Sequence, residues 1–152
     1  MRWVKAMLCG SMLAGLLAGC SAPPPKNIGL HGGRLQPCPS SPNCVCSQDH
    51  DKQHAIAPFA YTGPRRAAMS RLAKAIRGMD GARIIEQTDD YLHAEYTTRW
   101  LRFVDDVEFY APADAPLIQV RSASRVGYSD FGVNRKRVEA IRSRFMAAAK
   151  GG

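Results

Sequence analysis

One acidic residue falls on the apolar side of a predicted strand, where it could do chemistry. Leu101, Phe103, Val107 and Phe109 alternate along one face of this strand, and Asp105 lies on the same face. A buried carboxylate costs free energy unless it is paired and hydrogen-bonded. Asp105 therefore predicts a partner nearby, which either ties a loop to the sheet or serves ligand or acid–base chemistry.

Basic residues gather close to this acid in the predicted structure. Arg135, Lys136 and Arg137 fall in the first turn of a predicted helix, where cations face the positive end of the helix dipole. An anion bound at the helix start would offset that cost, and Arg121 and Arg125 lie on the preceding strand. Neutralisation by neighbouring acids is the alternative interpretation.

We predict that these groups meet at one end of the sheet. Pairing the last two predicted strands about the loop 111–116 places Asp105 opposite Ser122 and Asp106 opposite Arg121. The apolar residues of both strands then share one face. The candidate network, expected to be one connected functional surface, comprises Asp105, Asp106, Arg121, Ser122, Ser124, Arg125, Tyr128, Asp130, Asn134, Arg135 and Arg137.

The N-terminal segment carries a different chemistry. Charged Arg2 and Lys5 precede an apolar run, residues 6–18, that is too short to span a bilayer. Its end, Leu17-Ala18-Gly19-Cys20, resembles the lipobox of bacterial lipoproteins. That resemblance implies a signal peptide over 1–19, acyl chains such as palmitate on Cys20, and a lipid-anchored protein of the cell envelope. In a Gram-negative cell it would face the periplasm, and Ser21 favours the outer membrane.

Three cysteines and two histidines form a cluster that suggests a metal site. Cys38, Cys44, Cys46, His50 and His54 are ligand types that zinc accepts. The usual Cys-x2-Cys spacing is missing, and an oxidising compartment favours disulfides. We therefore expect no metal, no cofactor and no catalytic residue here. Three thiols make one bridge and leave one cysteine free.

The net charge of the chain indicates which classes of partner it attracts. The formal net charge is +8, and two of the basic residues belong to the predicted signal. A basic envelope protein is attracted to anionic lipid head groups or other acidic polymers. Nucleic acid is not expected as a partner of an exported, anchored chain.

Hydrophobic periodicity predicts the elements that position these residues. We expect a turn-rich knot over 38–47, helices over 64–77 and 134–149, and strands over 54–61, 83–87, 91–99, 101–110 and 117–125. Asn134 is the expected N-cap of the second helix.

The order of these elements, β-α-β-β-β-β-α, predicts an α+β two-layer sandwich. Its antiparallel sheet has four or five strands, with two helices on one face. Residues 20–37, rich in Pro and Gly, are expected to be a tether, and 38–150 a single domain.

Four segments together resemble the family called domain of unknown function 1499, which occurs in bacterial envelope proteins and in plastids. They are 38–47, 102–109, 120–130 and 131–138, and the likeness spans most of 35–145. The third cysteine position is often Ser in that family, whereas this chain has Cys46. The resemblance therefore implies a Cys38–Cys44 bridge, a fold and a compartment, but no reaction.

Two functions are compatible with these features. The first is an envelope lipoprotein whose domain is not catalytic and binds a partner protein or an anionic envelope ligand. The second is a small extracytoplasmic enzyme that acts on an acidic substrate through Asp105 and the basic cluster 121–137. A deep pocket that contains Asp105, Arg125 and Tyr128 would favour the enzyme, whereas mutual pairing of these groups would favour the first.

Overall fold

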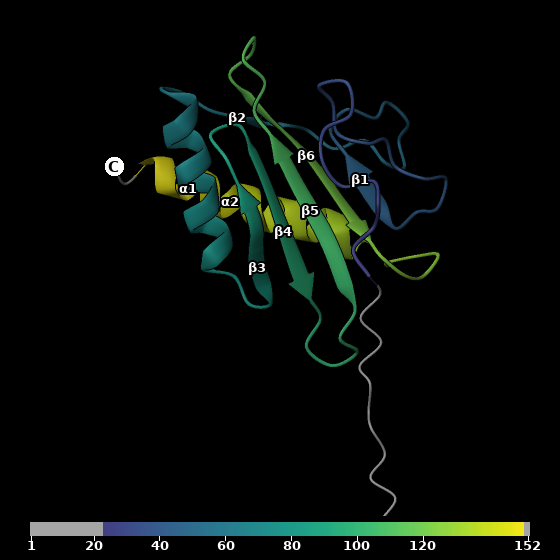
Figure 1. Ribbon diagram of the computed structural model, residues 1–152. Helices are drawn as coiled ribbons and strands as arrows, with labels where there is room; N and C mark the ends of the chain where they lie inside the picture. The colour runs from purple at the N-terminus through teal and green to yellow at the C-terminus, as the bar shows by residue number, and fades with distance from the viewer. Residues whose placement is uncertain (1–22, 151–152) are drawn as a thin grey trace, which may run out of the picture.

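The computed structural model describes residues 23–150 as a six-stranded antiparallel sheet with two helices (Figure 1). The elements are β1 (Cys44–Cys46), β2 (Phe59–Ala60), α1 (Arg65–Arg77), β3 (Ala82–Gln87), β4 (Tyr91–Thr97), β5 (Val104–Tyr110), β6 (Leu117–Ser124) and α2 (Val133–Lys150). The strand order is β1-β6-β5-β4-β3, and β2 also pairs with β6. The predicted signal peptide and Cys20 lie outside the described residues.

The α+β class and the order of the main elements are confirmed. The additional strand is β1, which pairs with β6 in a segment predicted to be a turn-rich knot. Within residues 23–150, neither helix combines the length and hydrophobicity that crossing a membrane requires.

Helix α1 forms where the apolar residues repeat at helical spacing. Its buried residues Met69, Leu72 and Ile76 face the sheet side of the domain. Lys74 and Arg77 lie in the last turn, where cations are favourable for the helix dipole. Burial of this stripe fixes the helix against α2 and β3.

Helix α2 begins differently from the prediction. Asn134 is not the N-cap, because the helix begins at Val133 and the Asn134 side chain is fully buried. The carboxylate of Asp130 accepts hydrogen bonds from the backbone N–H groups of Gly132, at 2.9 Å, and Asn134, at 2.8 Å. Asp130 thus satisfies helix-start donors, and the Asn134 amide is available for contacts inside the domain.

Both faces of the central strand β5 are buried. Val107 and Phe109 belong to the hydrophobic core under the helices. On the other face, the Gly29 N–H donates to Glu108 at 2.7 Å, and the buried Leu35 N–H donates to Gln48 at 2.9 Å. The tether is predicted to end at residue 37, but hydrogen bonds to the sheet begin at Gly29, so this part of the segment covers the second face.

The predicted register of β5 and β6 is wrong by two residues. Asp105 pairs with Ser124, and Asp106 pairs with Ala123, in place of Ser122 and Arg121. The loop is wider than expected: Tyr110 pairs with Gln119, and Leu117 and Ile118 pair with β2 on the other side of β6. A shift of two leaves each side chain on the same face, so the hydrophobic pattern does not discriminate between the two registers.

Candidate functional site

The candidate residues divide between the two faces of the sheet. Asp105, Ser122 and Ser124 point toward the helices, whereas Asp106, Arg121 and Arg125 point to the other face, because successive side chains alternate along a strand. The single connected network that the sequence predicts is therefore divided into groups of contacts on the two faces. We call them the helix-side network and the outer-face network.

Asp105 is the acid of the helix-side network. It is 3% exposed, and the Arg137 guanidinium of α2 donates to it at 2.5 Å. The same guanidinium lies over the Tyr96 ring at 5.0 Å and donates to the Asn134 side chain at 2.7 Å. Burial raises the pKa of Tyr96 to about 12. Asp105 is thus neutralised inside the domain by a cation from α2.

Asn134 is the centre of the helix-side network. Its Oδ1 accepts from the Ser122 hydroxyl at 2.5 Å. Its Nδ2 donates to Asp130 at 2.8 Å, to the Ser124 hydroxyl at 2.9 Å and to the Asn43 carbonyl at 3.0 Å. One buried amide therefore joins β6, α2 and the residue before β1, which gives it a structural role.

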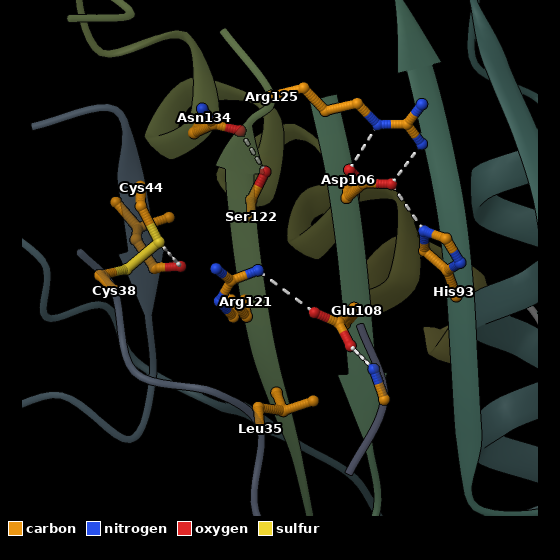
Figure 2. A network of polar contacts seen from close by, with 12 residues as sticks. Leu35, Cys38, Cys44, His93, Asp106, Glu108, Arg121, Ser122, Arg125 and Asn134 are labelled. Carbon is orange, nitrogen blue, oxygen red and sulfur yellow. Dashed lines mark hydrogen bonds and ion pairs between the residues drawn. A yellow bond between two sulfur atoms is a disulfide. The ribbon is translucent and has the colours of Figure 1, made fainter. Parts of the chain in front are cut away.

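The outer-face network is built around Asp106 (Figure 2). Arg125 donates to both carboxylate oxygens at 2.7 Å, and its Nη2 also donates to Glu95 at 2.5 Å. His93 Nε2 lies 2.8 Å from the same carboxylate. Burial raises the pKa of Asp106, but the hydrogen bonds from Arg125 and His93 outweigh that effect and lower it.

Glu108 is the second buried acid of the outer face. It accepts hydrogen bonds from Tyr91 Oη at 2.8 Å and from the Gly29 N–H at 2.7 Å. It also accepts from Arg121 at 3.3 Å (Figure 2). Burial and the Glu108 charge raise the pKa of Tyr91 well above its usual range. The ion pairs on this face therefore balance its charges: the acids Glu95, Asp106 and Glu108 contact the cations Arg83, Arg121 and Arg125.

Two candidate residues lie outside both networks. Arg135 donates to the backbone carbonyls of Ala55, at 2.8 Å, and Gln53, at 3.0 Å, so it fastens the segment before β2. Tyr128 is 76% exposed and borders none of the cavities described below.

The predicted bridge between Cys38 and Cys44 is confirmed, with the two Cα atoms 5.6 Å apart. Cys46 is free and buried, and burial raises the pKa of its thiol. The bridge removes two of the five cluster residues as zinc ligands.

Within the described residues, one group brings potential metal ligands within 4.8 Å of each other: Asp49, Asp51 and His54. His54 Nδ1 contacts Asp51, and His54 Nε2 contacts the Ser41 carbonyl at 3.2 Å. Both ring nitrogens are therefore engaged inside the protein.

An open surface lies where the loop between β4 and β5 meets the connection from β6 to α2. A cavity of about 890 Å³ is lined by Arg99, Arg102 and Lys136, together with Asp80 and Arg137. We call it the basic cavity.

A neighbouring groove of about 580 Å³ is lined mainly by apolar side chains. Trp100, Leu101 and Phe103 come from the β4–β5 loop, and Val126 and Phe131 come from the connection to α2. Asp105 borders this groove, whereas Arg125 and Tyr128 do not. We call it the apolar groove.

Few residues of this surface are among the candidate residues predicted from the sequence. The strand predicted to begin at residue 101 begins at Val104, so Leu101 and Phe103 lie in the loop and are exposed. A signal was present in the sequence, because Arg99-Trp100-Leu101-Arg102 mixes large apolar and basic residues at the break between two predicted strands. Arg102 and Phe131 both have positive φ, at 56° and 52°, which is unfavourable for residues with a side chain.

Comparisons with known proteins agree with the resemblance. Residues 34–145 match the model of the family described as Protein of unknown function (DUF1499). The match includes all four segments that carry the resemblance and ends within α2, at residue 145. Neither a curated protein nor a solved structure matches the chain significantly.

Proposed function

We propose that this chain, which belongs to the DUF1499 family, is a lipid-anchored envelope protein whose domain binds an anionic envelope ligand at the basic cavity. The domain acts by binding and not by catalysis. The observation that carries this proposal is the contrast between buried acids that are paired with cations and a basic cavity whose cations face solvent.

Pairing of the acids favours a binding role over an enzyme. Asp105 contacts Arg137, Asp106 contacts Arg125, and Glu108 contacts Arg121. A general acid or base must reach a substrate proton. These three residues are at most 3% exposed, and their carboxylates are held by hydrogen bonds and ion pairs inside the domain. Their arrangement suits a scaffold that fixes the sheet, the helix and the covering segment.

The basic cavity supplies the charge that an anion needs. Arg99, Arg102 and Lys136 have no carboxylate within ion-pair distance among residues 23–150. Asp80 is the one acidic residue that lines the basic cavity. Its volume of about 890 Å³ lies in the range of small-molecule sites. Three cations around an open cavity favour an anionic ligand of head-group size.

The location follows from the N-terminal segment. The lipobox-like Leu17-Ala18-Gly19-Cys20 supports acylation of Cys20 and attachment to an envelope membrane. In a Gram-negative cell this is the periplasmic face, with the outer membrane favoured. If another envelope protein copurifies with this one, the partner is a protein and not an anionic ligand.

Titration with soluble lipids tests the proposal. Dihexanoyl phosphatidylglycerol should bind the purified protein and perturb NMR signals of residues that line the basic cavity, whereas dihexanoyl phosphatidylcholine should bind much more weakly. The variant Arg99→Gln/Arg102→Gln/Lys136→Gln should lose this preference. The matched control Arg34→Gln/Lys52→Gln/Arg66→Gln removes three exposed cations elsewhere and should retain it. Equal binding of both lipids, or equal loss in both variants, would contradict the proposal.

A further inference from the structure

The largest exposed apolar side chains of the domain gather at one end of the sheet. Trp100 is 86% exposed, Leu101 70% and Phe131 90%. They come from two loops that lie together, since both line the apolar groove. Exposed patches of large apolar side chains mark interaction surfaces.

The charges around this patch identify the class of its partner. Arg99 lies over the Trp100 ring at 5.6 Å, and Arg102 and Lys136 line the adjoining basic cavity. Nearby Asp105 and Asp130 are held by Arg137 and by helix-start N–H groups. Tryptophan, phenylalanine and leucine bordered by cations are characteristic of surfaces that enter the interface of an anionic membrane.

The described chain begins at the same end of the sheet. Pro25 and Asn27 border a cavity of about 370 Å³ together with Ser124 and Arg125, and Ser124 also borders the apolar groove. Figure 1 shows the first described residues, in purple, passing the end of β6 near the connection between β6 and α2. The stretch from Pro23 back to Cys20 is three residues, which span at most ~10 Å.

We infer that this end of the domain docks on the bilayer interface of the anchoring membrane. Trp100, Leu101 and Phe131 enter the interface, and the basic cavity lies at the level of the anionic head groups. The short connection to Cys20 favours this orientation, because it holds that end of the sheet beside the anchor. The inference rests on the lipidated Cys20 of the proposed function.

Fluorescence of Trp100 tests the docking. The chain has two tryptophans, and Trp3 belongs to the predicted signal, so Trp100 is the single tryptophan after processing. The full-length gene product, processed and purified, is placed in vesicles of phosphatidylglycerol and phosphatidylcholine with brominated acyl chains. Trp100 emission should shift to the blue and lose most of its intensity. Replacing Phe131, as Phe131→Asp, should reduce both effects without unfolding, because this side chain is exposed.

A tryptophan at the other end of the sheet provides the control. Trp100→Phe/Ala113→Trp places it in the exposed β5–β6 loop, and its emission should stay unquenched. Equal quenching at the two positions, or none at Trp100, would overturn the docking. A blue-shifted but unquenched Trp100 would mean that protein covers it, which also overturns the inference. Mass spectrometry of the Cys20 peptide on the same sample separates the two proposals. A lipidated protein with unquenched Trp100 overturns the docking alone, whereas an unlipidated one overturns both.

Discussion

Asp105 and Asp106 are neighbours in the chain but form ion pairs on opposite faces of the sheet. Asp105 contacts Arg137 of α2, and Asp106 contacts Arg125 at the end of β6. Each acid therefore ties the beginning of β5 to a different partner. The Asp105 contact ties β5 to the helix layer, and the Asp106 contact ties it to the end of β6 on the other face of the sheet.

Replacing Arg125 should destabilise the protein strongly. Arg125→Ala removes the guanidinium that pairs with both oxygens of the buried Asp106, leaves His93 as a contact of that carboxylate and removes a contact of Glu95. Breaking a buried ion pair in this way costs ~3–5 kcal/mol. Urea unfolding gives the difference in the free energy of unfolding. As a control, Arg135→Ala removes hydrogen bonds to two backbone carbonyls and should cost only ~1 kcal/mol. Similar costs for the two variants would contradict the assigned role of Arg125.

The acids of the outer face should make stability depend on pH in the acid range. The pKa values of Asp106 and Glu95 are lowered, because hydrogen bonds from arginines outweigh burial. Below about pH 4, where the unfolded carboxylates take up protons, the unfolded state binds more protons and stability falls by up to ~1.4 kcal/mol per pH unit for each group. The stabilisation that the lowered pKa values of Asp106 and Glu95 contribute is fully present above that range.

Measuring the free energy of unfolding between about pH 2 and 6, the range in which carboxyl groups titrate, checks this dependence. Asp106→Asn should be less stable at neutral pH and should show a shallower fall in acid. Asp114→Asn, in the exposed β5–β6 loop, should keep the original slope. An unchanged slope in Asp106→Asn would show that this carboxylate does not contribute to acid unfolding.

Asn134 should tolerate substitution poorly although it touches no solvent or ligand. Asn134→Leu removes one hydrogen-bond partner each from Ser122, Asp130 and Arg137, with a cost of ~1–3 kcal/mol for each buried group that stays unsatisfied. Thermal unfolding should show a large loss. Ser129→Ala, at an exposed position in the same connection, should change stability by less than ~1 kcal/mol.

The bridge between Cys38 and Cys44 should stabilise the domain by ~2 kcal/mol, as loop closure of this short segment predicts. Reducing agent should lower the unfolding midpoint of the original chain and leave that of Cys38→Ser unchanged. Cys46 should react with alkylating reagents only after unfolding, because it is buried and its thiol pKa is raised. Rapid alkylation of folded protein would contradict its placement.

The sequence contained enough information for most of the fold but not for the site. Helical spacing of Met69, Leu72 and Ile76 placed α1 to within one residue, since the pattern reflects the buried face directly. Strand alternation also implied that Asp105 and Asp106 point apart. The partner of Asp105, in contrast, lies 32 residues away on α2, and only the packed structure brings it close.

The exposed loops were the least predictable part. Apolar alternation through Leu101 and Phe103 imitates a continuing strand, and nothing local marks that the strand begins at Val104. Backbone bonds between Thr98 and Arg102 and between Thr98 and Phe103 close this turn. An apolar residue that serves an interface has the same alternation pattern as one that serves the core, so this pattern alone does not reveal the apolar groove.

The most direct test of the binding role is the lipid composition that accompanies the native lipoprotein. The protein is extracted with its surrounding membrane into polymer-bounded discs and the lipids are quantified by mass spectrometry, for the original chain and for Arg99→Gln/Arg102→Gln/Lys136→Gln. We predict enrichment of anionic lipids around the original chain and its loss in the variant. The account would be contradicted by bulk membrane composition around both proteins, or by a stoichiometric envelope protein that the substitutions do not remove.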